Sequence, residues 1–94
     1  MLIVVAIIRS KPEALETVKA SLIGLVAPTR AEAGCVQYDL NQDRADPNLF
    51  VFFERWESDA ALDAHAASAH IAAHQARVAG LLESADIHKM THIA

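Results

Sequence analysis

The sequence predicts an α+β fold in which helices cover one face of a four-stranded antiparallel sheet. Four segments have the length and apolar pattern of strands, two longer segments have helical periodicity, and they follow one another in the order βαββαβ. This order is that of the ferredoxin-like, or split βαβ, unit. Because 94 residues is the size of one small domain, we expect a single domain over residues 1–94.

The first strand is expected in the apolar run from Leu2 to Arg9, which is continuous and rich in β-branched residues. Such a run is typical of a strand covered on both faces. The run is short and has no basic region before it, which disfavours a signal peptide or a membrane span. Pro12 then lies in the first turn of a helix, whose apolar residues fall on one stripe: Leu15, Val18, Leu22 and Leu25.

The middle of the chain predicts two strands joined by a polar turn. Pro28 and Gly34 bound a short helical piece, and residues 35–40 alternate as a half-buried strand. Residues 41–48 form the turn, and residues 49–57 form the third strand. Both faces of that strand are mostly apolar, one with Phe50, Phe52, Glu54 and Trp56, the other with Leu49, Val51, Phe53 and Arg55.

A helical segment follows the third strand and runs to about Leu82. Ser58 is a good N-cap, and Asp59 suits the positive end of the helix dipole. Ser68 could cap a second helix, so a break near residues 66–67 is an open alternative to one continuous helix. Residues 86–93 alternate and predict the last strand.

The composition predicts a homodimer. Apolar residues make up 53% of the chain, which is more than a lone small domain needs inside. A sheet with helices on one face leaves its other face bare, and here that face carries Phe, Val and Ile. We therefore expect two copies to pack through this face as a barrel-like dimer.

The charge pattern and the single cysteine exclude several classes of function. The net charge is −4 and the basic residues are scattered, so we expect no nucleic acid partner. Cys35 cannot form an internal disulfide and is expected to be a small core residue, which fits a reducing cytoplasmic location. No membrane partner is expected, because the N-terminal apolar run is short. No GxGxxG spacing is present, so neither a flavin nor a nicotinamide cofactor is expected.

Several short segments together carry a family resemblance. They read PTRAEAGCVQY over 28–38, DPN over 46–48, FVFFERWES over 50–58, ALDAH over 61–65 and SAH over 68–70. In this order and at these separations the set resembles the antibiotic biosynthesis monooxygenase superfamily, in particular its quinol monooxygenase-like branch. The resemblance implies a dimeric α+β barrel that oxidises a small electron-rich aromatic with dioxygen and needs no cofactor.

The chemistry that the resemblance implies asks little of a protein. A phenolate or enolate can itself reduce dioxygen, so the site must bind a flat apolar molecule, remove its proton and position oxygen. His65 or His70 could be the base, because imidazole titrates near neutrality. Phe50, Phe52 and Trp56 could form the flat wall, although Trp56 could also be a core residue only.

Two further residues of the strands are candidates for contact with a substrate. Tyr38 could hydrogen-bond a quinol oxygen, or its hydroxyl could lie at the rim of the sheet. Glu54 stands among phenylalanines and must find a partner or raise its pKa. A salt bridge to Arg55 or Arg77, or a bond across the dimer, is the alternative to proton transfer by Glu54.

Three histidines fall in the second helical region. On one unbroken helix His65 and His70 would be about 140° apart, whereas His70 and His74 would be about 40° apart. They cannot all face one site unless a break near Ser68 relaxes the geometry. The pair His70 and His74 has a spacing known from zinc sites, but no third ligand and no HExxH motif accompany it, so no metal is expected.

Two other functions stay open at this point. His74 stands where the haem-degrading branch of the family places its iron ligand, but that branch also uses an asparagine on the first strand, which this chain lacks. A non-catalytic dimeric module that binds a small molecule is the other alternative, since fold alone does not decide function. Leu62 stands where anthrone-oxidising members carry a tyrosine, which favours a simple quinol over a polyketide.

Overall fold

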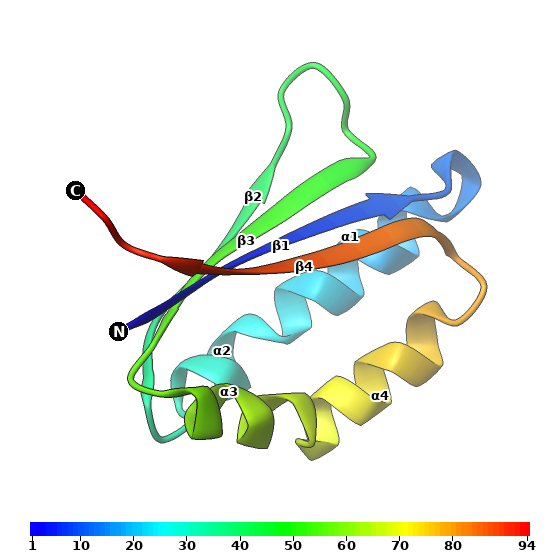
Figure 1. Ribbon diagram of the computed structural model, residues 1–94. Coiled ribbons are helices and arrows are strands. Elements are labelled where there is room, and N and C mark those ends of the chain that lie inside the picture. Colours follow the sequence, from blue (N-terminus) through cyan, green and yellow to red (C-terminus); the bar gives the residue numbers. More distant parts are fainter.

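The computed structural model describes all 94 residues and has the predicted ferredoxin-like order of elements. The strands are β1 (Leu2–Ser10), β2 (Cys35–Gln42), β3 (Leu49–Trp56) and β4 (Leu82–Thr91). The helices are the 3₁₀ turn η1 (Pro12–Ala14), α1 (Leu15–Gly24), α2 (Val26–Arg30), α3 (Asp59–Ala66) and α4 (Ala69–Val78). The strands form one antiparallel sheet in the order β2-β3-β1-β4, with all the helices on one side of it (Figure 1).

The core lies between this helix layer and the inner face of the sheet. Val4, Ala6 and Ile8 alternate inward along β1, and Ala6 pairs with Phe52 on β3. From the helix side, α1 and its C-cap residue contribute three residues of the predicted stripe, which are at most 2% exposed: Val18, Leu22 and Leu25. The helical periodicity read from the sequence therefore describes the packing of α1 correctly.

The outer face of the sheet is apolar and no helix covers it (Figure 1). Ile3, Val5 and Ile7 on β1 are half-buried, and so is Val51 on β3. Phe53 is 36% exposed on the same face. This is the surface through which the sequence predicts dimerisation, and the dimer stays a prediction.

The helical region after β3 is broken, as one of the two sequence alternatives predicts. The Ser58 hydroxyl accepts a hydrogen bond from the backbone N–H of Ala61 at the start of α3, and the Ser68 hydroxyl accepts one from that of Ile71 at the start of α4. Two residues, Ala67 and Ser68, separate the helices. Because of this break, the angles calculated for one continuous helix do not apply between residues of α3 and residues of α4.

Several expected boundaries move, and the second strand runs to Gln42 instead of ending at residue 40. The short helix starts before Pro28 rather than at it, because proline is tolerated within the first turn of a helix. Helix α4 ends at Val78 and not near Leu82, since Gly80 follows with a φ of +76°. The last strand then begins at Leu82 instead of Asp86, because β4 pairs along almost the whole of β1. None of the helices has the length and apolar character needed to cross a membrane.

Gly34 holds the start of β2 against α3. Its φ is +83°, and a Cβ added there would lie 2.5 Å from the Cβ of Ala61. Its carbonyl accepts a hydrogen bond of 2.9 Å from the backbone N–H of Glu57. Only glycine fits this position, and the close approach brings the preceding loop, with Glu32, beside α3.

Candidate active site

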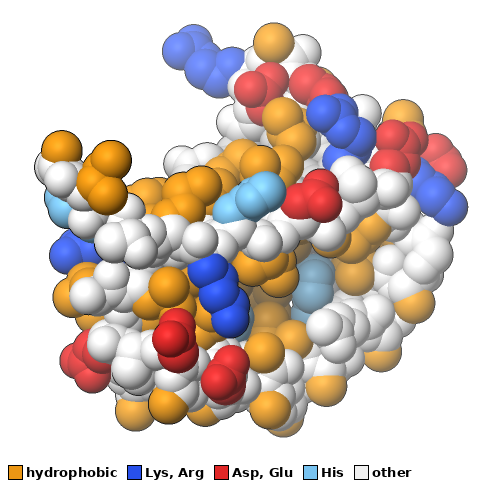
Figure 2. All heavy atoms as spheres, viewed as in Figure 1, with side chains coloured by type: hydrophobic (Ala, Val, Ile, Leu, Met, Phe, Trp, Pro, Cys, Tyr) orange, Lys and Arg blue, Asp and Glu red, His pale blue; other side chains and the backbone are white.

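A cavity of about 340 Å³ lies between the inner face of the sheet and helices α1, α3 and α4. Of the 21 residues that line it, 14 are hydrophobic, and this size and character are typical of small-molecule sites. Figure 2 shows the molecule hollowed between β4 and the helices below it, with hydrophobic side chains around the opening. The polar side chains in the lining include Tyr38, Glu54, His65 and His74.

The cavity separates the predicted site residues into two groups. Tyr38, Phe52, Glu54 and His65 line it, whereas Phe50, Trp56 and His70 do not. Tyr38 and Phe52 stack with ring centroids 4.6 Å apart, so these two rings form an aromatic wall. Phe50 and Trp56 are 1% and 0% exposed and belong to the core, with the Trp56 ring 4.8 Å from that of His65.

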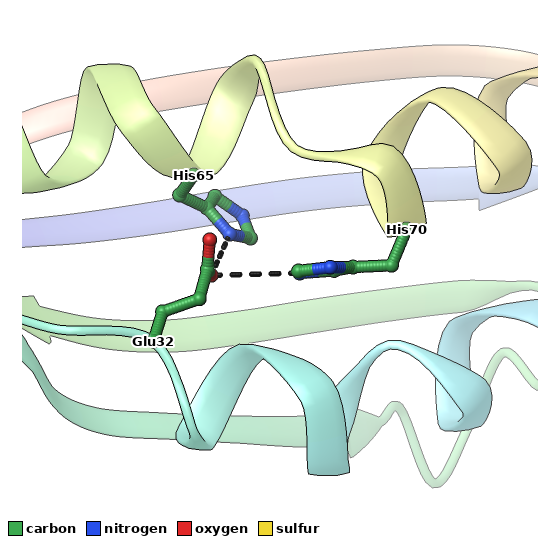
Figure 3. Close-up of side chains that lie close together, drawn as sticks. All are labelled: Glu32, His65 and His70. Carbon is green, nitrogen blue, oxygen red and sulfur yellow. Dashed lines mark hydrogen bonds and ion pairs between the residues drawn. The ribbon is translucent and has the colours of Figure 1, made fainter.

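His65 and His70 both point at Glu32, a residue that the sequence analysis did not single out (Figure 3). His65 Nδ1 lies 2.6 Å from Glu32 Oε2, and His70 Nε2 lies 3.5 Å from the same oxygen. Glu32 stands in the loop between α2 and β2, 33 positions before His65. No local pattern marks it, since it lies between two alanines in the stretch where the sequence predicts only a short helical piece.

The bond to Glu32 fixes the proton of neutral His65. A carboxylate only accepts hydrogen bonds, so Nδ1 of His65 carries the hydrogen and Nε2 keeps its lone pair. No group of the chain bonds to Nε2, and the side chain lines the cavity. In its neutral form His65 thus has an unbonded Nε2, and the side chain borders the cavity.

Glu54 is a carboxyl group inside the apolar wall. It is 4% exposed, and its Oε1 accepts a hydrogen bond of 2.9 Å from Trp56 Nε1. Burial raises the pKa of Glu54 to about 7, and this rise is opposed by the Trp56 bond and assisted by the charge of Glu32. The expected salt bridge to Arg55 or Arg77 is absent, because Arg55 lies on the outer-facing side of β3 and Arg77 binds elsewhere.

Tyr38 lies beside Glu54 on the neighbouring strand, where the two residues are directly paired. The tyrosine is 2% exposed, so its hydroxyl is not at the rim. Burial, followed by the nearby Glu54 carboxyl, raises the pKa of Tyr38 well above its ordinary value. Its hydroxyl therefore stays protonated, and the tyrosine side chain lines the cavity.

His74 belongs to a different group of contacts from His65 and His70. Its Nδ1 lies 2.7 Å from Ser21 Oγ on α1, and Arg77 Nε donates to the same oxygen at 3.0 Å. Burial, and then the charge of Arg77, lower the pKa of His74. The sequence analysis missed Ser21, because nothing near it in the sequence indicates a contact with a residue 53 positions later.

The ligand atoms of Glu32, His65 and His70 lie within 4.8 Å of one another. This is a different set from the pair His70 and His74 that the sequence analysis weighed as a zinc site, because His74 contacts Ser21 instead. The short bond between Glu32 and His65 already joins two of these donors.

Comparison with known proteins places these features in one family. A sequence model described as antibiotic biosynthesis monooxygenase matches residues 1–77. The chain is 42% identical over 79 residues to "Putative monooxygenase Rv0793" of Mycobacterium tuberculosis, which covers 84% of this chain and 77% of that protein. It is 39% identical over 70 residues to "Putative monooxygenase YcnE" of Bacillus subtilis, and this alignment covers 74% of this chain and 74% of that protein.

Solved structures agree over almost the whole chain. The crystal structure of PA3566 from Pseudomonas aeruginosa superimposes with a TM-score of 0.94 at 41% identity, covering 99% of this chain and 94% of that one. The structure of Rv0793 from Mycobacterium tuberculosis has a TM-score of 0.91 at 33% identity, covering 99% and 95%. The similarity therefore includes β4, which lies beyond the residues matched by the family model.

Proposed function

Because this chain belongs to the antibiotic biosynthesis monooxygenase family, we propose that it is a cofactor-independent monooxygenase that oxidises a small quinol-like aromatic with dioxygen. The names of the two curated relatives support the reaction class. The compact cavity and its largely hydrophobic lining support a substrate of one or two rings. The choice of a quinol as the substrate is supported by the resemblance of the sequence to the quinol monooxygenase-like branch and by the arrangement of the polar groups in the cavity.

The orientation of His65 carries this proposal. Its Nδ1 is held by Glu32, and its Nε2 lone pair is free at the cavity. Nε2 removes the proton of a quinol hydroxyl, and Glu32 stabilises the imidazolium that forms, as a carboxylate does in a Ser-His-Asp triad. The phenolate then transfers electrons to dioxygen, one oxygen atom enters the ring, and the other leaves as water together with the two hydrogens that the quinol loses.

The aromatic wall and Glu54 support the same reaction. Tyr38 and Phe52 offer a stacked apolar surface for a flat ring. Glu54 has a pKa of about 7, so it can take up or release a proton near neutrality while the substrate changes charge. His70 does not line the cavity, and its contact with Glu32 gives it an indirect role.

Oxygen uptake by the metal-free protein tests the proposal. With a panel of hydroquinones, His65→Gln should lower kcat by about 10²–10⁴-fold, the contribution of a general base. His92→Ala is the matched control, because this histidine is exposed and lies outside the cavity. With labelled dioxygen, one labelled atom should appear in each product molecule.

Two results would contradict the proposal. One is full activity in the His65→Gln variant, which would show that His65 is not the base. The other is a failure of every hydroquinone to consume oxygen while an aromatic ligand still raises the melting temperature, which would favour a non-catalytic binding module.

A further inference from the structure

A second histidine lines the cavity, and its hydrogen bonds differ in kind from those of His65. Helix α4 places His74 at the wall, and α1 places Ser21 behind it. Arg77 lies one turn after His74 on α4 and reaches the same serine. The three side chains form one chain of contacts, from Arg77 Nε to Ser21 Oγ at 3.0 Å and from Ser21 Oγ to His74 Nδ1 at 2.7 Å.

The direction of these hydrogen bonds follows from what each group can donate. Arginine only donates, so Ser21 Oγ accepts from Arg77. Ser21 is 6% exposed and has no other hydrogen-bond partner than Arg77 and His74, so its own hydrogen is directed to His74 Nδ1. His74 Nδ1 is therefore an acceptor, and the ring hydrogen stands on Nε2.

His74 stays neutral in this arrangement. Burial and the charge of Arg77 both lower its pKa, so the ring does not gain a second proton near neutrality. No group of the chain accepts a hydrogen bond from Nε2, although the side chain is at the cavity. The result is a neutral N–H donor at the wall of an apolar cavity, without a partner from the protein.

We propose that His74 is a hydrogen-bond donor subsite that binds a second oxygen of the substrate, a carbonyl or phenolate oxygen, and that Ser21 and Arg77 are positioning residues that fix its tautomer. The proposal rests on the proposed function and narrows its substrate class. His65 presents a lone pair to the cavity, whereas His74 presents a hydrogen. The site thus suits an aromatic that carries one hydroxyl to be deprotonated and another oxygen able to accept.

The subsite predicts selectivity against molecules that lack the second oxygen. A buried donor that loses its partner is costly, and sites built to hydrogen-bond a substrate reject analogues without that group. A donor at the second oxygen also stabilises the negative charge that spreads through the ring when the first hydroxyl is deprotonated. Dihydroxy or hydroxy-keto aromatics should therefore be preferred over monophenols.

The same tautomer bears on the haem alternative. A histidine that ligates a metal uses one ring nitrogen as the ligand and donates a hydrogen bond from the N–H of the other. In His74 it is Nδ1 that contacts the protein, and it accepts a hydrogen bond from Ser21 Oγ. The other ring nitrogen, Nε2, therefore carries the hydrogen. The contacts of His74 do not fit an iron ligand.

Long-range proton–nitrogen NMR correlation of the imidazole rings tests the tautomer directly, whether or not the protein is active. We expect His74 in the wild-type protein to show a protonated Nε2 and an unprotonated Nδ1. Ser21→Ala should shift the ring toward a mixture of tautomers. A wild-type ring protonated on Nδ1 would overturn the proposal.

Binding of two electron-poor or inert phenols tests the subsite itself. Isothermal titration should show that 4-hydroxyacetophenone binds more tightly than 4-isopropylphenol, which has a similar shape but no acceptor, by on the order of tenfold. Ser21→Ala and His74→Leu should reduce or remove that preference. Gln75→Ala is the control, since Gln75 lines the cavity beside His74 but has no contact with Ser21, and it should keep the preference.

The outcomes separate the subsite from the reaction. Equal affinity for the two phenols, or no measurable binding of the ketone, overturns the subsite, and oxygen uptake that depends on His65 would then leave the monooxygenase proposal standing. A preference that depends on Ser21 and His74, without oxygen uptake from any hydroquinone, supports the subsite and counts against the monooxygenase.

Discussion

His65 and Glu32 lie 33 positions apart in the chain, yet His65 Nδ1 and Glu32 Oε2 are 2.6 Å apart. The histidine comes from α3 and the glutamate from the loop before β2 (Figure 3). Gly34 allows this loop to approach α3 closely, because its missing Cβ leaves room for Ala61. The orientation of the proposed base therefore depends on a loop as well as on its own helix.

Replacing Glu32 by glutamine should lower oxygen uptake by about tenfold, a smaller loss than that of the His65→Gln variant. Glutamine keeps a hydrogen-bond partner for His65, but it carries no charge and its amide can hold either tautomer. Steady-state oxygen uptake should show the loss mainly in kcat. His70→Ala, which removes the other neighbour of Glu32, should keep most of the activity; a larger loss in His70→Ala than in His65→Gln would assign the base to His70.

Glu54 should make the stability of the protein depend on pH. Its pKa is raised from 4.5 to about 7 in the folded chain, so between these values the folded chain holds more protons than the unfolded chain. The contribution of Glu54 to the free energy of unfolding is therefore largest below pH 4.5, and it falls as the pH rises through 7. The loss is at most about 3.5 kcal/mol, since each unit of pKa corresponds to about 1.4 kcal/mol.

Urea denaturation of the wild type and of Glu54→Gln at pH 5 and pH 8 measures this effect. Glutamine keeps an acceptor for Trp56 Nε1 but does not titrate. The variant should gain stability relative to the wild type as the pH rises, at a fixed protein concentration. The same difference between the two proteins at both values would show that Glu54 titrates normally.

The outer face of the sheet should mediate a homodimer. Phe53 is 36% exposed at the middle of this face, and Phe53→Lys would place a charge in the interface. Sedimentation at micromolar concentration should show a dimer for the wild type and a shift toward monomer for the variant. Ile23→Lys is the control, because Ile23 is 54% exposed on α1, in the helix layer, and a monomeric wild type would contradict the prediction.

Gly34→Ala should destabilise the fold more than Gly80→Ala. Both glycines have a positive φ, so alanine is strained at either position. Only at Gly34 would the new Cβ meet another atom, at 2.5 Å, whereas nothing lies within 4 Å at Gly80. The difference between the two variants in thermal or chemical denaturation isolates the steric contact, which should add about 1–3 kcal/mol, and equal losses would show that the loop before β2 can move.

The fold could be predicted because its signals are local. The continuous apolar run of β1, the stripe on α1 and the caps Ser58 and Ser68 each specify their element through neighbouring residues. The position of β4 was less clear, because most of this strand is exposed in the single chain and its pairing with β1 sets its start.

The site was predicted only in part, because its contacts join distant segments. Tyr38, Phe52, Glu54 and His65 could be named as candidates, since each residue type is unusual or suited to the chemistry at its place. Glu32 and Ser21 have no local signal, and their roles arise from packing against α3 and α4. Trp56 and Phe50 share the inner face of β3 with Phe52, and strand alternation alone cannot tell which of these rings borders an empty space.

The two-residue joint between α3 and α4 has a consequence for how such a site could diversify. Helix α3 carries His65, the proposed proton acceptor, and α4 carries His74, the proposed hydrogen-bond donor. Because each helix has its own serine cap, substitutions along α4 can reshape one end of the cavity without rotating His65 away from Glu32. If the proposed roles hold, the joint separates a helix that keeps the base in place from a helix that can vary to recognise a different molecule.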